Sequence, residues 1–411
     1  MTTTDAPAAG NAPAQHGDPD AAGNRFASPE DLRRQIREFV SLHSPPNMRG
    51  LEYGKRIAYM RSWAATLYDH GFAGPAWPRD YGGMQLSLAE QVGYHDEFAK
   101  HAVPSHPGNG PSIAGPTLLR FGTPEQRRRY LPPMLRGDEV WAQGFSEPSA
   151  GSDLQSLTTS ARRDGDDYVV RGSKLWSSYA DVADFMFALV RTGDRDSGAH
   201  GISYLLIDLR RDGVTVRPLR DMSGGSRFCE VFLDDVRVPA VNRVGSENGG
   251  WQLARTTLGY ERAARSLSHA SSYRRRMDHL IKLLQARGVL GDAVARDRLA
   301  RCESAVRVLS FNAARTASAL ETTGSPGPSA SIARLFQSQL EQTFYEAAVD
   351  LLGPDALLLS GERAIEGGRW AAGYLHSRGA TIGAGTAEIQ RNTIAEQILE
   401  MPRSGTGGQS S

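Results

Sequence analysis

Cysteine is almost absent from this sequence of 411 residues, which contains only Cys229 and Cys302. Two isolated cysteines provide neither a disulfide framework nor the paired spacing of a structural metal site. We therefore expect no metal. Thiols that stay reduced favour a cytoplasmic location.

An excess of charge of one sign is also missing, because 47 basic and 46 acidic residues leave a net charge of +1. Such a balance gives no electrostatic attraction to nucleic acid or to an anionic membrane surface. No apolar run approaches the roughly 20 residues of a membrane span, and no signal peptide is recognised. The composition is that of an ordinary globular protein, expected to bind neither nucleic acid nor membrane.

The length predicts two or three domains, and the residue pattern changes twice along the chain. Residues 1–25 hold almost nothing large and apolar, and residues 404–411 are small and polar. Both are expected to be disordered tails. Between them we expect an N-terminal helical domain over 26–140, a middle β domain over 141–246 and a C-terminal helical bundle over 247–403.

Local signals support this division. Ser87 and Glu90 form a helix-capping box, whereas short β-prone runs such as Tyr168-Val169-Val170 indicate a small antiparallel barrel or sandwich in the middle. Helical periodicity returns after Gly250 and predicts a bundle of four long helices, at about 251–287, 292–322, 329–352 and 368–400. The expected fold class is α+β.

The stretch from 143 to 178 is the most informative part of the chain. It begins with Ser146–Asp153, a run of small and polar residues that can present N–H groups and hydroxyls to a ligand. It ends with Trp176-Ser177-Ser178, and Asp164-Gly165 is a turn signal between the two. If the flanking strands pair, a flat apolar surface edged with donors results, which suits a planar heterocycle carrying phosphates. The alternative is a plain hairpin with an exposed loop.

Four motifs in the expected order resemble the acyl-CoA dehydrogenase family, over about residues 28–403. The stretch 146–178 resembles its flavin-binding signature, and 382–391 resembles its closing motif. Glu230–Pro239 resembles the strand that leaves the middle domain, and segments 74–78 and 81–83 also fit. The resemblance implies three domains in the order helical, β-barrel and four-helix bundle, with FAD as cofactor and an acyl-CoA thioester as substrate.

Residue by residue, the resemblance implies a set of cofactor contacts. Gln143, Phe145 and Ser146 are expected against the polar ring of the flavin. Gly151 and Ser152 are expected at its ribityl-phosphate region and at the CoA arm. Trp176 would pack on the ring, with Ser177 beside it and Ser178 near the hydride-accepting nitrogen. The last loop would add Thr386 and Glu388.

The catalytic base departs from the commonest family pattern. Many members place a glutamate just before the Gly-Thr of the closing motif, but this chain has Ala384 there. Members similar to isovaleryl-CoA and long-chain acyl-CoA dehydrogenases instead carry it before an arginine on the first C-terminal helix, where this chain reads Glu261-Arg262. Glu261 is therefore the expected base, with Arg262 orienting it. The alternative is a solvated ion pair. Expected substrate contacts are Ser152, Leu258, Tyr260, Arg262, Ala384 and Gly385.

Two weaker motifs keep other readings open. An Arg-x-x-Phe-Gly segment is reduced to arginines at 274–276, and a Gln-x-x-Gly-Gly pattern on the adenine side is reduced to 350–354, which retains Gly353. Similar losses occur in relatives that resemble sterol side-chain-degrading enzymes, some of which pair unlike subunits. The resemblance implies a homotetramer or a heterotetramer with a homologous subunit, and an electron-transfer flavoprotein as acceptor. The alternatives are a flavin-poor partner subunit, or an oxidase or desaturase acting on a carrier-bound acyl group.

Overall fold

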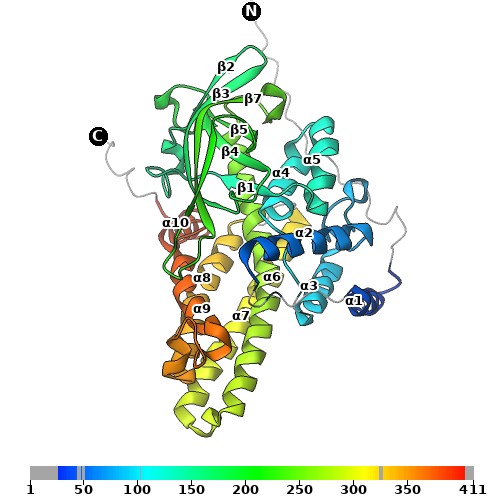
Figure 1. The fold of residues 1–411 in the computed structure, drawn as a ribbon, viewed down its shortest axis with the longest axis vertical. Helices are drawn as coiled ribbons and strands as arrows, with labels where there is room; N and C mark the ends of the chain where they lie inside the picture. The colour runs from blue at the N-terminus through cyan, green and yellow to red at the C-terminus, as the bar shows by residue number, and fades with distance from the viewer. Residues whose placement is uncertain (1–25, 44–47, 49–50, 102, 324–326, 403–411) are drawn as a thin grey trace, which may run out of the picture.

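The computed structural model describes residues 26–43, 48, 51–101, 103–323 and 327–402, and only the backbone at 260–267 and 320–321. The two expected tails therefore lie outside the described residues, as do the side chains of Tyr260, Glu261 and Arg262. Figure 1 shows the β-sheet at one end of the molecule, long helices at the other, and the N-terminal helices beside the junction.

Five helices form the N-terminal part: α1 (Pro29–His43), α2 (Tyr53–Asp69), α3 (Leu88–Lys100), α4 (Gly115–Phe121) and α5 (Pro124–Arg136). The capping box predicted at Ser87 and Glu90 is present, because the Ser87 side chain accepts from the Glu90 N–H and the Glu90 carboxylate accepts from the Ser87 N–H. Thr123 and Gln126 form a second box at α5.

The middle part is one sheet of eight strands: β1 (Trp141–Gly144), β2 (Ser160–Asp164), β3 (Asp167–Ser178), β4 (Phe185–Arg191), β5 (Ile202–Asp208), β6 (Val214–Leu219), β7 (Phe228–Pro239) and β8 (Arg243–Val244). The order is β6-β7-β3-β2-β4-β5-β8, and β1 pairs with β4. Most pairs are antiparallel, as predicted, but β4 runs parallel to both β1 and β2. The predicted turn at Asp164-Gly165 is confirmed, since Asp164 pairs with Asp167 across the β2–β3 hairpin.

The C-terminal part contains α6 (Gly250–Ala286), α7 (Ala293–Thr323), α8 (Ser329–Leu352), α9 (Arg369–Ser377) and α10 (Ala387–Gln397). The α+β fold class is confirmed, but the single long helix expected over 368–400 is wrong. That stretch breaks between α9 and α10, because Ala384 and Gly385 adopt left-handed φ angles of 56° and 90°. The break leaves a connecting stretch between Ser377 and Ala387. No helix within the described residues is long and apolar enough to span a membrane.

Candidate active site

A cleft of about 3170 Å³ lies where the three parts of the chain meet. Its walls come from α3 and the loops around it, from β1 and β3 with the loop after β1, and from α6, α8 and the α9–α10 loop. Most of the predicted site residues line it: Gln143, Phe145, Ser146, Gly151, Ser152, Trp176, Ser178, Leu258, Ala384, Gly385 and Thr386. Segments more than 200 residues apart in sequence therefore share one cavity.

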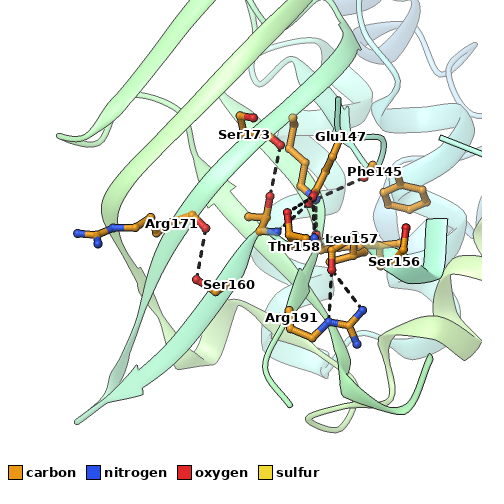
Figure 2. A network of polar contacts seen from close by, with 12 residues as sticks. Phe145, Glu147, Ser156, Leu157, Thr158, Ser160, Arg171, Ser173 and Arg191 are labelled. Carbon is orange, nitrogen blue, oxygen red and sulfur yellow. Dashed lines mark hydrogen bonds and ion pairs between the residues drawn. The ribbon is translucent and has the colours of Figure 1, made fainter. Parts of the chain in front are cut away.

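A buried ion pair between Lys174 and Glu147 fixes the loop after β1. Lys174 Nζ lies 2.7 Å from Glu147 Oε1, and it also donates to the carbonyl oxygens of Phe145, at 3.3 Å, and Leu189, at 2.7 Å. Glu147 in turn accepts from the N–H groups of Thr158 and Thr159, at 2.7 and 2.9 Å (Figure 2). One lysine and one glutamate thus join the loop, β3 and β4.

Both members of this pair are charged at neutral pH. Burial alone would raise the pKa of Glu147, but the charge of Lys174 and the hydrogen bonds from Lys174, Thr158 and Thr159 outweigh it and lower the pKa to about 2. Burial lowers the pKa of Lys174 to about 8, against the opposing effect of Glu147. The pair supports the loop and does not supply protons.

Arg191 fixes the far end of the same loop. Its guanidinium donates to the Leu157 carbonyl oxygen at 3.2 and 3.3 Å (Figure 2). It also donates to the Gln155 carbonyl oxygen at 2.6 Å. The loop is therefore held at both ends, and the small residues between, such as Gly151, stay open toward the cleft. A Cβ atom at Gly151 would meet nothing within 4 Å.

Trp176 projects from the end of β3 beside this loop. The Leu175 N–H donates to the Ser146 carbonyl oxygen at 2.9 Å, which sets the strand end next to the loop, as the sequence predicted. The pairing with β7 shifts between Lys174 and Ser177, and within this bulge Trp176 takes a φ of 61°. Its ring is 57% exposed. A large aromatic held in a strained backbone conformation and left open in a cleft is typical of a ligand site.

The structure separates the two serines that follow. Ser178 lines the cleft, whereas Ser177 is fully buried, pairs with Cys229 and lies in the sheet interior. Successive side chains on a strand point to opposite faces, so only one of the two can meet a ligand. The Ser177 side chain therefore does not line the cleft, and the contact of Ser177 with the cofactor stays a prediction.

The α9–α10 loop forms the opposite wall. Arg334 on α8 donates to the carbonyl oxygens of Ala380, at 2.6 Å, and Gly383, at 2.7 Å. Thr386 caps α10 by accepting from the Ile389 N–H at 3.2 Å. Ala384 offers only a methyl group to the cleft, so no carboxylate stands at the position where many relatives carry their base.

Besides Ser177, two other predicted cofactor contacts do not line the cleft of this chain. Glu388 points to solvent on α10, where its side chain is 75% exposed and pairs with Arg391. Gly353 ends α8 with a φ of 82°. Sequence reasoning also assigned no role to Lys174, Glu147 or Arg334. A charged residue inside the β-prone run before Trp176 was the available signal for Lys174.

The described residues fit an isoalloxazine ring with its ribityl phosphate. The exposed face of Trp176 offers a stacking surface, Ser178 and Ser146 place hydroxyls beside it, and the open space at Gly151 admits close approach of a bulky group. The α6 positions that line the cleft include Trp251 and Leu258.

Comparisons with known proteins agree with this geometry. Family models of the acyl-CoA dehydrogenase N-terminal, middle and C-terminal domains match residues 27–138, 142–236 and 248–399. Acyl-CoA dehydrogenase IpdE1 of Mycobacterium tuberculosis is 36% identical over 350 residues, covering 84% of this chain and 89% of that protein.

Two solved structures are similar over nearly the whole chain. The Tcur3481-Tcur3483 steroid ACAD is 29% identical with a TM-score of 0.81, over 92% of this chain and 98% of that one. The ChsE4-ChsE5 complex from Mycobacterium tuberculosis is 31% identical with a TM-score of 0.79, over 93% of this chain and 100% of that one. The chain therefore belongs to the acyl-CoA dehydrogenase family, which are FAD-dependent oxidoreductases acting on CH–CH groups of acyl-CoA thioesters.

Proposed function

We propose that this chain introduces a trans-2,3 double bond into an acyl-CoA thioester, with Glu261 removing the α-proton. The register of α6 supports the assignment. Position 261 follows Leu258 by three residues and precedes Ser268 by seven, and both of these line the cleft. Positions with these spacings share one face of a helix, so residue 261 falls on the face that borders the cleft.

The remaining roles follow from chemistry at that site. FAD, when bound, supplies the hydride acceptor that no side chain can provide. A carboxylate in a water-poor pocket is a stronger base because burial raises its pKa toward neutrality. Arg262 would orient Glu261, and Tyr260 would shape the pocket next to it. Ser152 and Gly385 would contact the thioester and the CoA arm.

Anaerobic titration with acyl-CoA thioesters, followed by flavin bleaching, tests the assignment. We expect Glu261→Gln to slow bleaching by at least about 100-fold, the usual contribution of a general base. Glu125→Gln is the matched control, since Glu125 is exposed on α5 and 74% accessible. Equal bleaching in the wild type and Glu261→Gln would remove Glu261 from its role.

We further propose that the chain works in an assembly with a copy of itself or a homologous subunit, and passes its electrons to an electron-transfer flavoprotein. The likeness to the ChsE4-ChsE5 complex supports a hetero-oligomer, and the likeness to a steroid ACAD supports an acyl group on a bulky ring system. Native mass spectrometry of the purified chain, with its flavin content, tests the assembly. A stable homotetramer with one FAD per chain would exclude the need for a second subunit.

A further inference from the structure

Polar side chains line both walls of the cleft where it runs between α3 and α6. From α3, Gln91, His95 and Ala99 line it at four-residue steps, which places them on one helix face. From α6 it is lined by Ser268, Ser272 and Arg275. The Ser271 hydroxyl donates to Asp96 Oδ1 at 2.6 Å and ties the two helices together at this level. An alkyl tail alone would not need such a lining.

His95 is the central group of this part of the cleft. Among the described residues its imidazole makes no hydrogen bond. Its ring lies edge-on to that of the adjacent Tyr94, with the ring centroids 5.3 Å apart and the planes at 90°. The neighbouring side chains are used elsewhere: the Tyr94 hydroxyl donates to the Phe72 carbonyl oxygen at 2.7 Å, and Gln91 Nε2 donates to that of Leu86 at 2.9 Å. His95 thus faces the cleft without a hydrogen-bond partner among the described residues.

The ring is neutral at physiological pH. Burial lowers the pKa of His95 to about 4, with the Asp96 charge acting in the opposite direction. A neutral imidazole has one donor and one acceptor nitrogen, and polar groups in such surroundings are normally hydrogen-bonded. His95 is only half-buried, so water in the cleft can satisfy its ring nitrogens, and a ligand that displaces this water must supply a hydrogen-bonding group of its own.

The surroundings of His95 favour an oxygen acceptor on an otherwise apolar body. Tyr94, Phe98 and Val103 line the same part of the cleft and offer apolar surface. Ser272 and Arg275 add donors opposite. Along α6, Ser268 and Ser272 lie seven and eleven residues beyond position 261, or about 10 and 16 Å at a rise of 1.5 Å per residue. This polar part of the cleft is thus well separated from the reacting carbons.

We propose that the substrate's acyl group carries an oxygen substituent far from the thioester, and that His95 recognises it by a hydrogen bond. The inference rests on the proposed function, since it assigns this part of the cleft to the acyl group. A hydroxyl, a ketone and a carboxylate share the required chemistry. A carboxylate would also engage Arg275, for which no ion pair exists among the described residues.

The test compares CoA thioesters matched in chain length: decanoyl-CoA, 9-oxodecanoyl-CoA, 10-hydroxydecanoyl-CoA and decanedioyl-CoA. Anaerobic calorimetry on Glu261→Gln holoenzyme gives Kd without turnover, and bleaching of the wild type gives kcat/KM. We expect the preferred oxygenated thioester to bind at least about tenfold tighter than decanoyl-CoA, the worth of one hydrogen bond to a buried partner. His95→Leu should abolish this preference, and His95→Gln should retain part of it.

The controls separate the possible failures. His200→Leu makes the same change at an exposed histidine outside the cleft and should leave every Kd unchanged. Arg275→Gln should weaken only decanedioyl-CoA if the oxygen belongs to a carboxylate. Equal Kd values for decanoyl-CoA and all three oxygenated thioesters, or a preference that survives His95→Leu, would overturn the inference. Loss of bleaching with every thioester, while the Kd preference persists, would overturn the proposed reaction and leave the role of His95 standing.

Discussion

Lys174 Nζ and Glu147 Oε1 lie 2.7 Å apart, with side chains only 0% and 2% exposed. The pair joins the loop after β1 to β3 two residues before Trp176. Its effect reaches the cleft through backbone groups, since Lys174 also holds the Phe145 carbonyl oxygen and Leu175 binds that of Ser146. One buried ion pair thus fixes the positions of both the loop after β1 and the strand end that carries Trp176.

Breaking that pair on one side should cost stability. Lys174→Met leaves the Glu147 carboxylate buried without its counter-charge, and Glu147→Gln does the converse. We expect each to lower the free energy of unfolding by about 3–5 kcal/mol, measured by urea denaturation. The double variant Lys174→Met/Glu147→Gln should recover part of the loss. Additive losses would show that the two residues act independently.

Low pH should lower the stability of the folded protein through protonation of the same glutamate, Glu147. The folded-state pKa of Glu147 is lowered to about 2 from its ordinary value of 4.5. Its contribution is therefore fully present above pH 4.5 and is lost as the pH falls through 2. Thermal unfolding between pH 6 and pH 3 should show a steeper fall in Tm for the wild type than for Glu147→Gln. Parallel curves would contradict the assignment.

Trp176 should matter for cofactor binding and little for folding. Its ring is 57% exposed, so Trp176→Ala should change the free energy of unfolding of the apoprotein by only about 0.5 kcal/mol. We expect the bound FAD per chain to fall markedly, read from the absorbance ratio of flavin to protein. Trp370 is buried in the helical bundle and serves as the control for a structural tryptophan. Trp370→Ala should lower the free energy of unfolding by about 3–5 kcal/mol.

The adjacent serines should respond differently. Ser178→Ala removes a hydroxyl from the cleft and should slow flavin bleaching. Ser177→Ala removes a buried hydroxyl that has no hydrogen-bond partner among the described residues, so stability should stay within about 1 kcal/mol of the wild type or rise slightly. Bleaching kinetics and urea midpoints on both variants measure the contrast. Slower bleaching in Ser177→Ala than in Ser178→Ala would contradict the assignment of Ser178, rather than Ser177, to the face of β3 that lines the cleft.

Ala384 offers a way to move the base. Ala384 already holds a Cβ atom at a left-handed φ of 56°. Replacing it with glutamate therefore adds no backbone strain from a Cβ atom at this φ. In a Glu261→Gln background we expect Ala384→Glu to restore part of the bleaching rate. Ala384→Gln in the same background is the matched control and should restore none.

The sequence by itself determined the local structure and the family. The capping box at Ser87 and Glu90 and the turn at Asp164-Gly165 lie within a few residues of chain, so short-range hydrogen bonding decides them. The flavin signature and the closing motif were also contiguous, and their order was enough to predict the α+β fold, the FAD and the acyl-CoA substrate.

Only the tertiary structure decided which residues of those motifs face the cleft. Whether Ser177 or Ser178 is buried depends on the shift in pairing between β3 and β7, and the break before α10 depends on a left-handed backbone at Ala384 and Gly385. Lys174 binds Glu147, which lies 27 residues earlier in the sequence. The part of the cleft around His95 is lined by residues of both α3 and α6. Burial and pairing between distant segments are collective properties of the packed chain, so no local pattern encodes them.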